Sequence, residues 1–468
     1  MGIRDKRRGI RDQGSGIRGC CSDNDTASVL SSGNSNSDPR YLIPVPRPPF
    51  LISHFSFLIL LSCISNPAAS PVSREIPVDI AGIVHAGHTN SPEEYALLEK
   101  MGVNWLLTTF SWNSIEPSDD QWNFDFYDEY VDTAKAAGKK IIGVLGYGVP
   151  WIHNDGKSRY YIPPDKIHFF LDYVRQTAEH FRGRVDAWCI WNEPNSRFWT
   201  GSRDEFLTLA RLTADAVKET DPDVILLGGA FNRGVFGLPA AYIRGLFESG
   251  AMEKVDAIAF HPYELNPVRA LRLYRAFESI VADYGFAGRI WLTEVGYPTG
   301  GWYPTKVAEK RFPEYVVKTF VNFAAGGAGK IIWYQLFDPV EREKGNSEDY
   351  FGLVRSRDDY TSKGAEAFRL CAVHLAGTVY RPALPPRGEL PKSLKAFYFE
   401  KPESSGGGAL VLWKDGASMK IALQTSGGIM HDPVSGNASA LPVQTVINIG
   451  AMPVFITSDS KIKISKGR

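Results

Sequence analysis

The sequence predicts an α/β fold, a (β/α)8 TIM barrel followed by a small C-terminal β-sandwich. From Val78 onward, short runs rich in Val, Ile and Leu alternate with amphipathic segments of helical length, the pattern of a parallel sheet covered by helices. There are eight such runs, spread over roughly 300 residues, which is the size of a barrel with modest insertions. After about Gly377 the helical periodicity ends and only strand-like runs remain.

The eight predicted barrel strands are separated by segments of helical length. They are Val78–His85, Asn104–Phe110, Lys140–Tyr147, Ala187–Asn192, Val224–Gly229, Ala257–His261, Ile290–Glu294 and Ile331–Leu336. An open, doubly wound sheet is the alternative. It would normally carry a glycine-rich phosphate loop after its first strand, and residues 82–85 do not form one.

Capping residues mark the ends of the predicted helices. Ser91 caps a helix that has Pro92 at its first position, and Gly102 ends that helix. Ser202 and Glu205 have the spacing of a capping box, in which each side chain accepts a hydrogen bond from a free backbone N–H.

The amino-acid composition of the chain changes on both sides of the predicted barrel. Prolines mark a linker near residue 382, and three strands are predicted beyond it, namely Ala409–Trp413, Lys420–Gln424 and Thr445–Ile449. The predicted domains are therefore a disordered region at 1–75, a catalytic barrel at 76–377 and a β-rich accessory domain at 378–468.

The N-terminal region resembles an export segment. A seven-residue repeat beginning GIRD lacks the apolar positions of a coiled coil. The apolar run at about 50–64 follows basic residues and precedes small ones, as in a secretory signal, and it is short for a membrane span. A buried core helix is the alternative. Because the preceding segment is too long for a signal, we expect the true start to lie downstream.

The segment Leu60 to Cys63 weakly resembles a bacterial lipoprotein cleavage site, which would place a lipid anchor on Cys63. The expected localisation is therefore export, as a secreted, periplasmic or membrane-anchored protein.

The bulk composition excludes some classes of function. With 52 basic and 52 acidic side chains the chain has no formal net charge, so it lacks the basic surplus of a nucleic-acid-binding protein. Only Cys189 and Cys371 fall in the folded part, which excludes a disulfide framework, and the apolar run around Cys189 predicts a buried, reduced thiol there. No stable protein partner is indicated.

Two glutamates end predicted strands at the catalytic face of the barrel. Glu193 follows strand four in the run Trp-Asn-Glu-Pro-Asn, and Glu294 ends strand seven in Leu-Thr-Glu-Val-Gly-Tyr. Barrel enzymes place their chemistry at the C-terminal ends of the strands. A single glutamate there is usually a solvated loop residue, but two with aromatic and small polar neighbours are far less easily explained that way.

A pair of carboxyl groups suits glycosidic cleavage. One must protonate the leaving oxygen while the other stabilises or captures the cation-like anomeric carbon. Mutual repulsion and an apolar wall can separate the pKa values of two glutamates, so that one is neutral and one charged at the same pH.

On these motifs the sequence resembles clan A, the retaining β/α-barrel glycoside hydrolases, over Ile76 to Leu375. It looks most like glycoside hydrolase family 39 and its exopolysaccharide-cleaving relatives, because Phe198-Trp199 follow the strand-four motif. The resemblance implies that Glu193 is the general acid/base and Glu294 the nucleophile, with no metal or organic cofactor.

The resemblance also implies substrate contacts. Asn192 matches the asparagine that binds the sugar 2-hydroxyl, and His261 with Tyr263 matches the clan's His-x-Tyr. Trp333 fits the aromatic floor under the sugar ring. Trp112 lines a neighbouring subsite or packs in the core.

One position departs from the clan pattern. Many members carry an arginine on strand two that keeps the nucleophile ionised, and here a leucine stands in its place. Another donor must serve, and His85 and His88 are the candidates.

Three functions are compatible with these residues. The leading one is a retaining hydrolase of β-linked oligo- or polysaccharides that works through a covalent glycosyl-enzyme. A non-catalytic polysaccharide-binding protein on the same barrel and a transglycosylase are the alternatives.

Overall fold

A computed structural model of the chain describes residues 73–85, 90–153, 159–234, 237–302, 306–382, 390–404 and 406–467. These residues belong to one compact unit. Residues 1–72 of the region predicted to be disordered, which include the apolar run at about 50–64 and Cys63, lie outside the described residues, as does His88. The prediction of disorder up to residue 75 is wrong at its end, because Arg74–Glu75 form a strand. In the described part of the chain, no helix is long and apolar enough to cross a bilayer.

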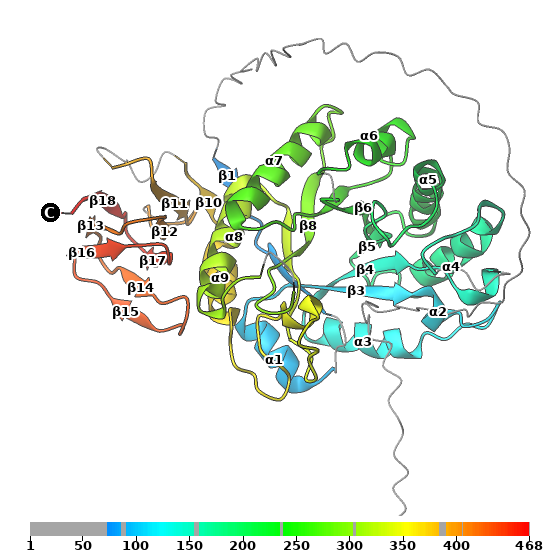
Figure 1. The fold of residues 1–468 in the computed structure, drawn as a ribbon, viewed down its shortest axis with the longest axis horizontal. Coiled ribbons are helices and arrows are strands. Elements are labelled where there is room, and N and C mark those ends of the chain that lie inside the picture. The colour runs from blue at the N-terminus through cyan, green and yellow to red at the C-terminus, as the bar shows by residue number, and fades with distance from the viewer. Residues whose placement is uncertain are drawn as a thin grey trace, which may run out of the picture. The chain divides into compact units, whose positions relative to one another are not determined.

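Eight parallel strands close into a barrel in chain order, which confirms the predicted fold class (Figure 1). All eight predicted strands are present, and their ends differ from the prediction by a few residues. They are β2 Ala81–Val84, β3 Trp105–Ser111, β4 Lys140–Gly146, β5 Ala187–Ile190, β6 Ile225–Asn232, β7 Ala257–His261, β8 Arg289–Val295 and β9 Lys330–Trp333.

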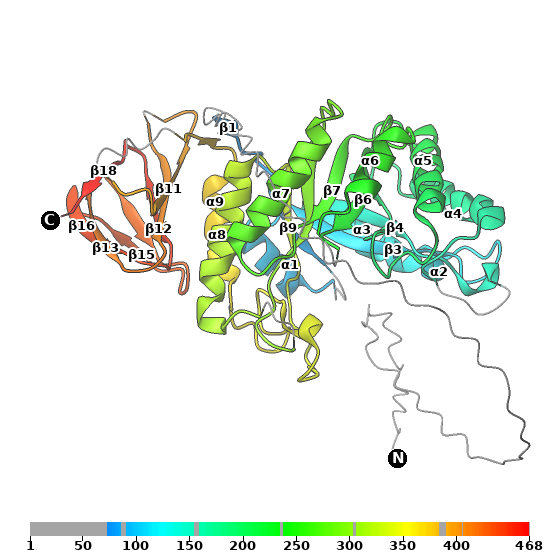
Figure 2. The same cartoon turned by 45° about the horizontal axis from the view of Figure 1, so that its top comes forward.

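Helices follow the strands and pack against one another around the outside of the barrel (Figure 2). They are α1 Pro92–Lys100, α2 Trp112–Ile115, α3 Asp125–Ala136, α4 Ile167–His180, α5 Arg203–Thr220, α6 Ala240–Glu248, α7 Pro267–Ala282, α8 Phe312–Gly326 and α9 Ala365–Leu375. Short 3₁₀ turns are η1 Pro150–Ile152, η2 Pro164–Lys166, η3 Glu309–Arg311 and η4 Ser347–Tyr350.

The predicted helix caps are confirmed. The Ser91 hydroxyl accepts a hydrogen bond from the N–H of Glu94 at 3.1 Å, and Gly102 has a φ of 70° just beyond the end of α1. At the start of α5 both bonds of the capping box between Ser202 and Glu205 are present.

The C-terminal strands form two antiparallel sheets, as the β-sandwich prediction requires. The larger sheet has the order β1-β10-β11-β12-β17-β14-β15 and the smaller has the order β16-β13-β18. The strands are β1 Arg74–Glu75, β10 Val379–Tyr380, β11 Leu394–Glu400, β12 Gly408–Lys414, β13 Met419–Gln424, β14 Ile429–His431, β15 Ala438–Ala440, β16 Gln444–Ile449, β17 Val454–Ser458 and β18 Lys463–Lys466.

The three predicted C-terminal strands are confirmed as β12, β13 and β16, and the others were missed. The larger sheet is buried on both faces. On β12, Leu410 and Leu412 join the core between the two sheets, whereas Val411 and Trp413 join the core of the barrel unit. Burial on both faces explains why this strand is a continuous apolar run.

The chain enters the larger sheet before it enters the barrel. Strand β1 pairs with β10, with Arg74 opposite Tyr380 and Glu75 opposite Val379. The domain boundaries at 75/76 and 377/378 stay a prediction.

Packed aromatic rings fill the N-terminal end of the barrel interior. Trp105 and Trp291 meet edge to face with ring centroids 5.1 Å apart, and the Lys330 ammonium lies over both rings. The Asp79 carboxylate binds Lys330 and also Lys140. Although burial opposes ionisation, these two lysines lower the pKa of Asp79 to about 2. Packed aromatic rings and the ion pairs of Asp79 therefore fill this end of the barrel interior.

Candidate active site

Glu193 lies three residues beyond the end of β5 in a strained turn. Its φ is 45° and that of Trp191 is 61°, both in the left-handed region that side chains disfavour. The backbone is held there by the Glu193 N–H, which donates to the Ala230 carbonyl at 2.7 Å, and by Ser196, whose N–H donates to the Glu193 carbonyl at 3.0 Å. The strain turns the Glu193 side chain into the barrel mouth, where it is 9% exposed.

Glu294 approaches Glu193 from β8. A carboxylate oxygen of each residue and a ring nitrogen of His261 lie within 4.8 Å of one another. The strand ends therefore bring together two carboxyl groups that are 101 residues apart in the chain, as 294 − 193 shows. This spacing matches the separation of roughly 5–5.5 Å seen in retaining glycosidases and is shorter than the gap of inverting enzymes.

His261, at the end of β7, lies between the two glutamates. Its Nδ1 is 2.9 Å from a Glu193 oxygen and 3.5 Å from a Glu294 oxygen, and its Nε2 is 3.0 Å from the Thr293 hydroxyl. Burial lowers the pKa of His261, but the charges of Glu294 and Glu193 raise it more, so the net shift is upward. Both ring nitrogens of His261 lie within hydrogen-bond distance of side-chain oxygens, and the three residues are also of the types that bind metal ions.

Tyr263 is the donor to Glu294. Its hydroxyl lies 2.9 Å from the Glu294 Oε2. Burial raises the pKa of Tyr263 well above that of an ordinary tyrosine, so the hydroxyl keeps its proton and donates. Burial raises the pKa of Glu294 to about 7 and the Glu193 charge adds to this, while His261 and the Tyr263 hydrogen bond oppose it.

Two asparagines complete the immediate surroundings of the pair. Asn192 precedes Glu193 in the chain, and the adjacent Trp191 ring packs edge to face on Tyr147, just beyond the end of β4, with ring centroids 5.2 Å apart. Asn232, at the end of β6, donates its Nδ2 to the Glu193 Oε2 at 2.7 Å. Asn232 was not among the predicted site residues, because the predicted strand ended at Gly229, three residues too early.

The aromatic residue at the end of strand eight is Tyr334, which corrects the prediction for Trp333. Trp333 is fully buried and packs against Tyr297 and Phe312. Tyr334 points the other way, since successive side chains of a strand alternate, and its ring lies 6.4 Å from that of Tyr263. Tyr334, and not Trp333, therefore faces the two glutamates.

Trp112 is also a core residue and not part of a subsite. Its side chain is 0% exposed, its indole N–H donates to Glu116, and its ring stacks on Tyr173. Of the two roles open to this residue, core packing is the correct one.

His85 does not serve the nucleophile. It is 1% exposed, its Nε2 lies 2.6 Å from Glu94 on α1, and its Nδ1 lies 3.3 Å from the Tyr130 hydroxyl on α3. The histidine ties the first strand to two helices. His261 and Tyr263, which both lower the pKa of Glu294, are the candidates to replace the missing arginine.

A third carboxylate lies near the pair and was missed. Glu348, in the turn after β9, accepts a hydrogen bond from the Tyr334 hydroxyl at 3.2 Å. Its side chain is exposed to solvent, but the surrounding protein weakens its hydration and raises its pKa, with a further contribution from Glu193 and an opposing one from Arg197. The sequence gives no periodic signal for it, because it lies in an irregular loop.

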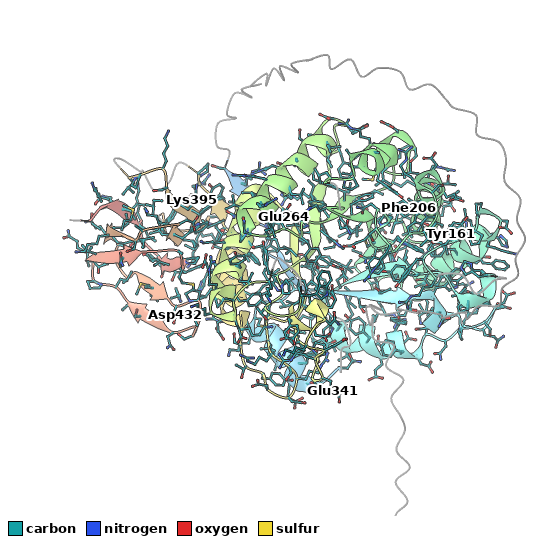
Figure 3. All side chains as sticks on the ribbon, viewed as in Figure 1. Tyr161, Phe206, Glu264, Glu341, Lys395 and Asp432 are labelled. Carbon is teal, nitrogen blue, oxygen red and sulfur yellow. The ribbon has the colours of Figure 1, made fainter. Side chains whose placement is uncertain are left out.

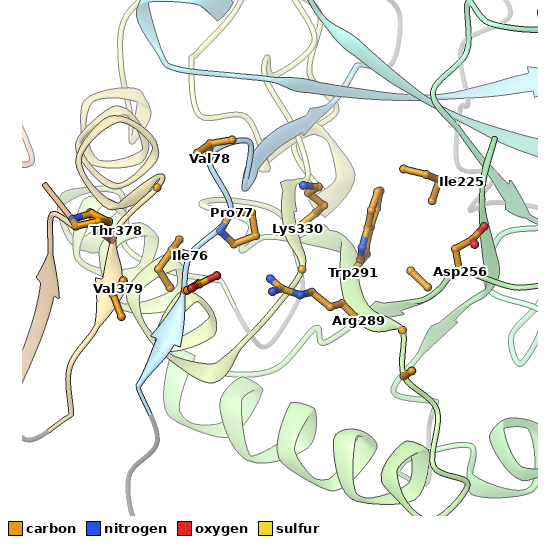
Figure 4. Close-up of a pocket in the computed structure, with 17 residues that line it drawn as sticks. Ile76, Pro77, Val78, Ile225, Asp256, Arg289, Trp291, Lys330, Thr378 and Val379 are labelled. Atoms are coloured by element: carbon orange, nitrogen blue, oxygen red, sulfur yellow. The ribbon is translucent and has the colours of Figure 1, made fainter. Parts of the chain in front are cut away.

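A separate cavity of about 770 Å³ lies at the opposite end of the barrel (Figure 4). Arg289 and Lys330, which line it, are the first residues of β8 and β9, whereas Glu294 is near the end of β8. The cavity is therefore remote from the two glutamates and does not belong to the candidate active site.

Comparison with known proteins finds similarity to glycoside hydrolases. The family model described as "Glyco_hydro_42: Beta-galactosidase" matches residues 85–146. Endo-1,4-beta-xylanase B of Thermotoga neapolitana is 25% identical over 284 residues, which cover 54% of this chain and 78% of that protein.

Solved structures share the fold. A family 39 glycoside hydrolase from Bacteroides cellulosilyticus superposes with a TM-score of 0.67 at 18% identity, over 82% of this chain and 81% of that one. A GH39 beta-xylosidase from Caulobacter crescentus gives 0.60 at 16% identity, over 84% and 97%. These comparisons confirm the resemblance to the barrel glycoside hydrolases that the two glutamate motifs indicate.

Proposed function

We propose that the protein is a retaining glycoside hydrolase that cleaves β-linked oligo- or polysaccharides. The observation that carries the proposal is the Glu193–Glu294 pair at the C-terminal mouth of the barrel, in which Glu193 is buried, Glu294 is part-buried and an oxygen of each lies within 4.8 Å of the other. A water molecule does not fit between a sugar and a nucleophile at that spacing. A polysaccharide-binding protein would have no use for two carboxyl groups that repel one another.

The first step is attack by the Glu294 carboxylate on the anomeric carbon. The bond from that carbon to the leaving oxygen breaks, and Glu193 gives its proton to the leaving oxygen. The Tyr263 hydroxyl orients Glu294, and Asn232 with His261 orients Glu193. Asn192 and Tyr334 are placed to contact the sugar.

The second step reverses the roles. Glu193, now a carboxylate, removes a proton from water, and the water oxygen attacks the anomeric carbon of the glycosyl-enzyme. The ester bond to Glu294 breaks and that carboxylate is restored. Two inversions give net retention.

Xylan-type substrates are the first to test. The relatives named above include an endo-1,4-beta-xylanase and a beta-xylosidase. This chain shares the barrel fold with the beta-xylosidase, with a TM-score of 0.60, so xylo-oligosaccharides and xylan are the substrates to test first.

The test is the stereochemistry of the first product. Proton NMR of a β-xylo-oligosaccharide digest, recorded before mutarotation, is expected to show the β-anomer first. An α-anomer as the initial product contradicts the double displacement. Release of no sugar from any β-glycan or aryl glycoside, by a folded protein, contradicts the hydrolase.

We also propose that the protein is exported. The support is the basic flank, the apolar run at about 50–64 and the small residues that follow it. Mass mapping of native protein from cell fractions tests this, since a mature chain that retains peptides from before Arg40 and stays in the cytoplasm contradicts it. A lipid-modified Cys63 at the new N-terminus would identify the lipoprotein form.

A further inference from the structure

We infer that Asn195 is a positioning residue for the reaction. It fixes the side-chain amide of Asn232, and that amide determines that Oε1 of Glu193 carries the catalytic proton. The inference rests on the proposed function, because it takes Glu193 as the acid. It gives a role to the second asparagine of the strand-four motif, whereas the resemblance to known enzymes gives a role to Asn192 alone.

The loop that carries Asn195 is fixed to helix α5. Trp199, four residues after Asn195, packs edge to face on Phe206 with ring centroids 5.7 Å apart and lies 5.6 Å from the Tyr161 ring (Phe206 and Tyr161 are labelled in Figure 3). The Trp199 indole N–H donates to the Ser202 carbonyl at 2.8 Å, at the start of the same helix. The loop therefore gives Asn195 a defined position.

A backbone donor fixes the orientation of the Asn195 amide. The Asn232 backbone N–H donates to the Asn195 Oδ1 at 3.1 Å. Because a backbone N–H never accepts, the atom of Asn195 that faces it must be the oxygen. The Asn195 Nδ2 is then turned toward Asn232, where it donates to the carbonyl oxygen at 3.1 Å and to Oδ1 at 2.8 Å. Three hydrogen bonds therefore join the two asparagines.

A second backbone donor fixes the Asn232 amide in the same way. The Gly234 N–H donates to the Asn232 Oδ1 at 2.7 Å, and Gly234 has a φ of 69°, which glycine adopts without strain. Oδ1 thus accepts from both Gly234 and Asn195, and half a turn of the amide would place Nδ2 against these two donors. The Nδ2 is therefore held on the other side, where it donates to the Glu193 Oε2 at 2.7 Å.

The strands place Asn232 and His261 at the two oxygens of Glu193. Asn232 on β6 is the register partner of His261 on β7, and the ladder between these strands skips Gly229, whose φ is 50°. Because side chains alternate along a strand, this extra residue determines that Asn232 faces the mouth. Asn232 contacts Oε2, and the His261 Nδ1 lies 2.9 Å from Oε1.

The two neighbours of Glu193 differ in what they do with a proton. The Asn232 Nδ2 only donates, whereas a histidine nitrogen donates or accepts. In a neutral carboxylic acid the carbonyl oxygen accepts hydrogen bonds better than the hydroxyl oxygen. Neutral Glu193 therefore keeps Oε2 as its carbonyl oxygen and carries its proton on Oε1.

The hydrogen bond from Asn232 gains strength during the first step. When the leaving oxygen takes the proton from Oε1, Glu193 becomes a carboxylate and the bond from Asn232 to Oε2 becomes charge-assisted. An interaction that is stronger in the transition state than in the ground state raises the rate. Asn195 contributes to this through its two bonds to Asn232, and it contacts neither the substrate nor Glu193.

The test measures proton donation separately from other losses. The substrates are the phenyl and 2,4-dinitrophenyl β-glycosides of the sugar that the protein turns over fastest, and kcat/KM reports the steps up to release of the phenol. Phenol needs the proton from Glu193, whereas 2,4-dinitrophenolate leaves without it. A change that harms proton donation lowers kcat/KM on the phenyl glycoside alone, and damage to the whole site lowers both values.

Asn232→Ala is expected to lower kcat/KM about 10- to 100-fold on the phenyl glycoside, the size of one hydrogen bond to a charged group, and less than about twofold on the dinitrophenyl glycoside. Asn195→Ala should give the same pattern with a loss of about five- to tenfold on the phenyl glycoside. Because Asn195 acts through Asn232, the double alanine variant should be no slower than Asn232→Ala.

Asn195→Asp separates the orientation of the amide from simple anchoring of the loop. Aspartate keeps an acceptor for the Asn232 N–H but turns an oxygen toward the carbonyl oxygen and Oδ1 of Asn232. It should therefore lose at least as much activity on the phenyl glycoside as Asn195→Ala.

Asn266→Ala is the matched control. The Asn266 Oδ1 also accepts from two backbone N–H groups, those of Val268 at 3.2 Å and Arg269 at 3.1 Å, but it caps α7. Its loss should lower the melting temperature and leave the ratio of the two kcat/KM values unchanged. Equal losses on the two glycosides in Asn195→Ala, an Asn195→Asp variant as active as the parent, or additive losses in the double variant overturn the inference.

If the parent turns over neither glycoside, the proposed function fails, and NMR then tests the chain of hydrogen bonds by itself. The side-chain amide signals of Asn232 are identified by their absence from Asn232→Ala. They should shift in both Glu193→Gln and Asn195→Ala, because each variant changes a direct partner of the amide. Signals that stay in place in either variant overturn the inference.

Discussion

Replacement of Tyr263 by phenylalanine tests how this protein keeps its nucleophile ionised without an arginine. The Tyr263 hydroxyl donates to the Glu294 carboxylate at 2.9 Å, and it is one of the influences that lower the pKa of Glu294 against burial. A hydrogen bond to a charged group contributes about 1.5–3 kcal/mol. Since 1.36 kcal/mol corresponds to one pKa unit, its loss should raise the pKa of Glu294 by about 1–2.

The sign of the effect follows from the role of the carboxylate. Attack needs ionised Glu294, so activity is lost on the acid side as Glu294 is protonated. A higher pKa means that this loss begins at higher pH. The acid limb of the kcat/KM profile on a nitrophenyl glycoside should therefore move up by about 1–2 pH units, and activity at pH 5 should fall about 10- to 100-fold.

A suitable control has the same chemistry at another place. Tyr284 donates to Glu248 at 2.8 Å on the outer surface, so Tyr284→Phe removes a similar bond and should leave the profile unchanged. An acid limb that stays in place in Tyr263→Phe, or moves to lower pH, would refute the assignment of Tyr263 as the donor that replaces the arginine.

Three further predictions follow. Glu294→Gln should leave the far-UV circular dichroism unchanged and reduce turnover of every substrate by at least about 10⁴-fold, because no other carboxylate is placed to form the ester; near-parent activity contradicts this. Glu193→Gln should reduce the rate about 10²- to 10⁴-fold on natural glycosides but much less on substrates with good leaving groups. Equal reductions of the pre-steady-state glycosylation rate on the two kinds of substrate argue against Glu193 as the acid. Asp79→Asn should lower the free energy of urea unfolding by about 2–4 kcal/mol at pH 7, because it leaves Lys330 buried without its partner. The pKa of Asp79 is about 2 in the folded protein and ordinarily 3.8, so this stabilisation is present above about pH 4 and disappears as pH falls through 2. The difference in unfolding free energy between parent and variant should therefore narrow in acid. A difference that is equal at pH 3 and pH 7, with no narrowing below that, contradicts the ion pair as its source.

The sequence determined the barrel and the identity of the glutamate pair. Eight apolar runs at regular spacing, with caps such as Ser91 and Ser202 between them, leave few arrangements other than a closed parallel sheet. Because all strands of such a sheet end at the same face, Glu193 and Glu294 had to meet there. Periodicity and capping are local properties, and each depends on residues within a few positions of one another.

Only the tertiary structure decided which neighbours serve the pair. The sequence does not say which of two adjacent aromatic residues faces the mouth, and a small change in where β9 ends exchanges Trp333 for Tyr334. His85 and Tyr263 are both plausible donors to Glu294 by residue type. In the structure His85 binds Glu94 on α1, whereas the Tyr263 hydroxyl donates to Glu294. These choices depend on contacts between segments far apart in the chain.

The same limit applies to the loops. Arg197 and Glu348 come from different strand ends, and neither belongs to a periodic pattern that predicts where it lies. The Arg197 guanidinium lies over the Phe198 ring and the Glu348 carboxylate accepts a hydrogen bond from Tyr334, and both contacts depend on the paths of irregular loops. The sequence by itself determined the reaction that the barrel mouth supports, because strand ends converge by symmetry, whereas the charge presented to the substrate depends on loop geometry that only packing fixes.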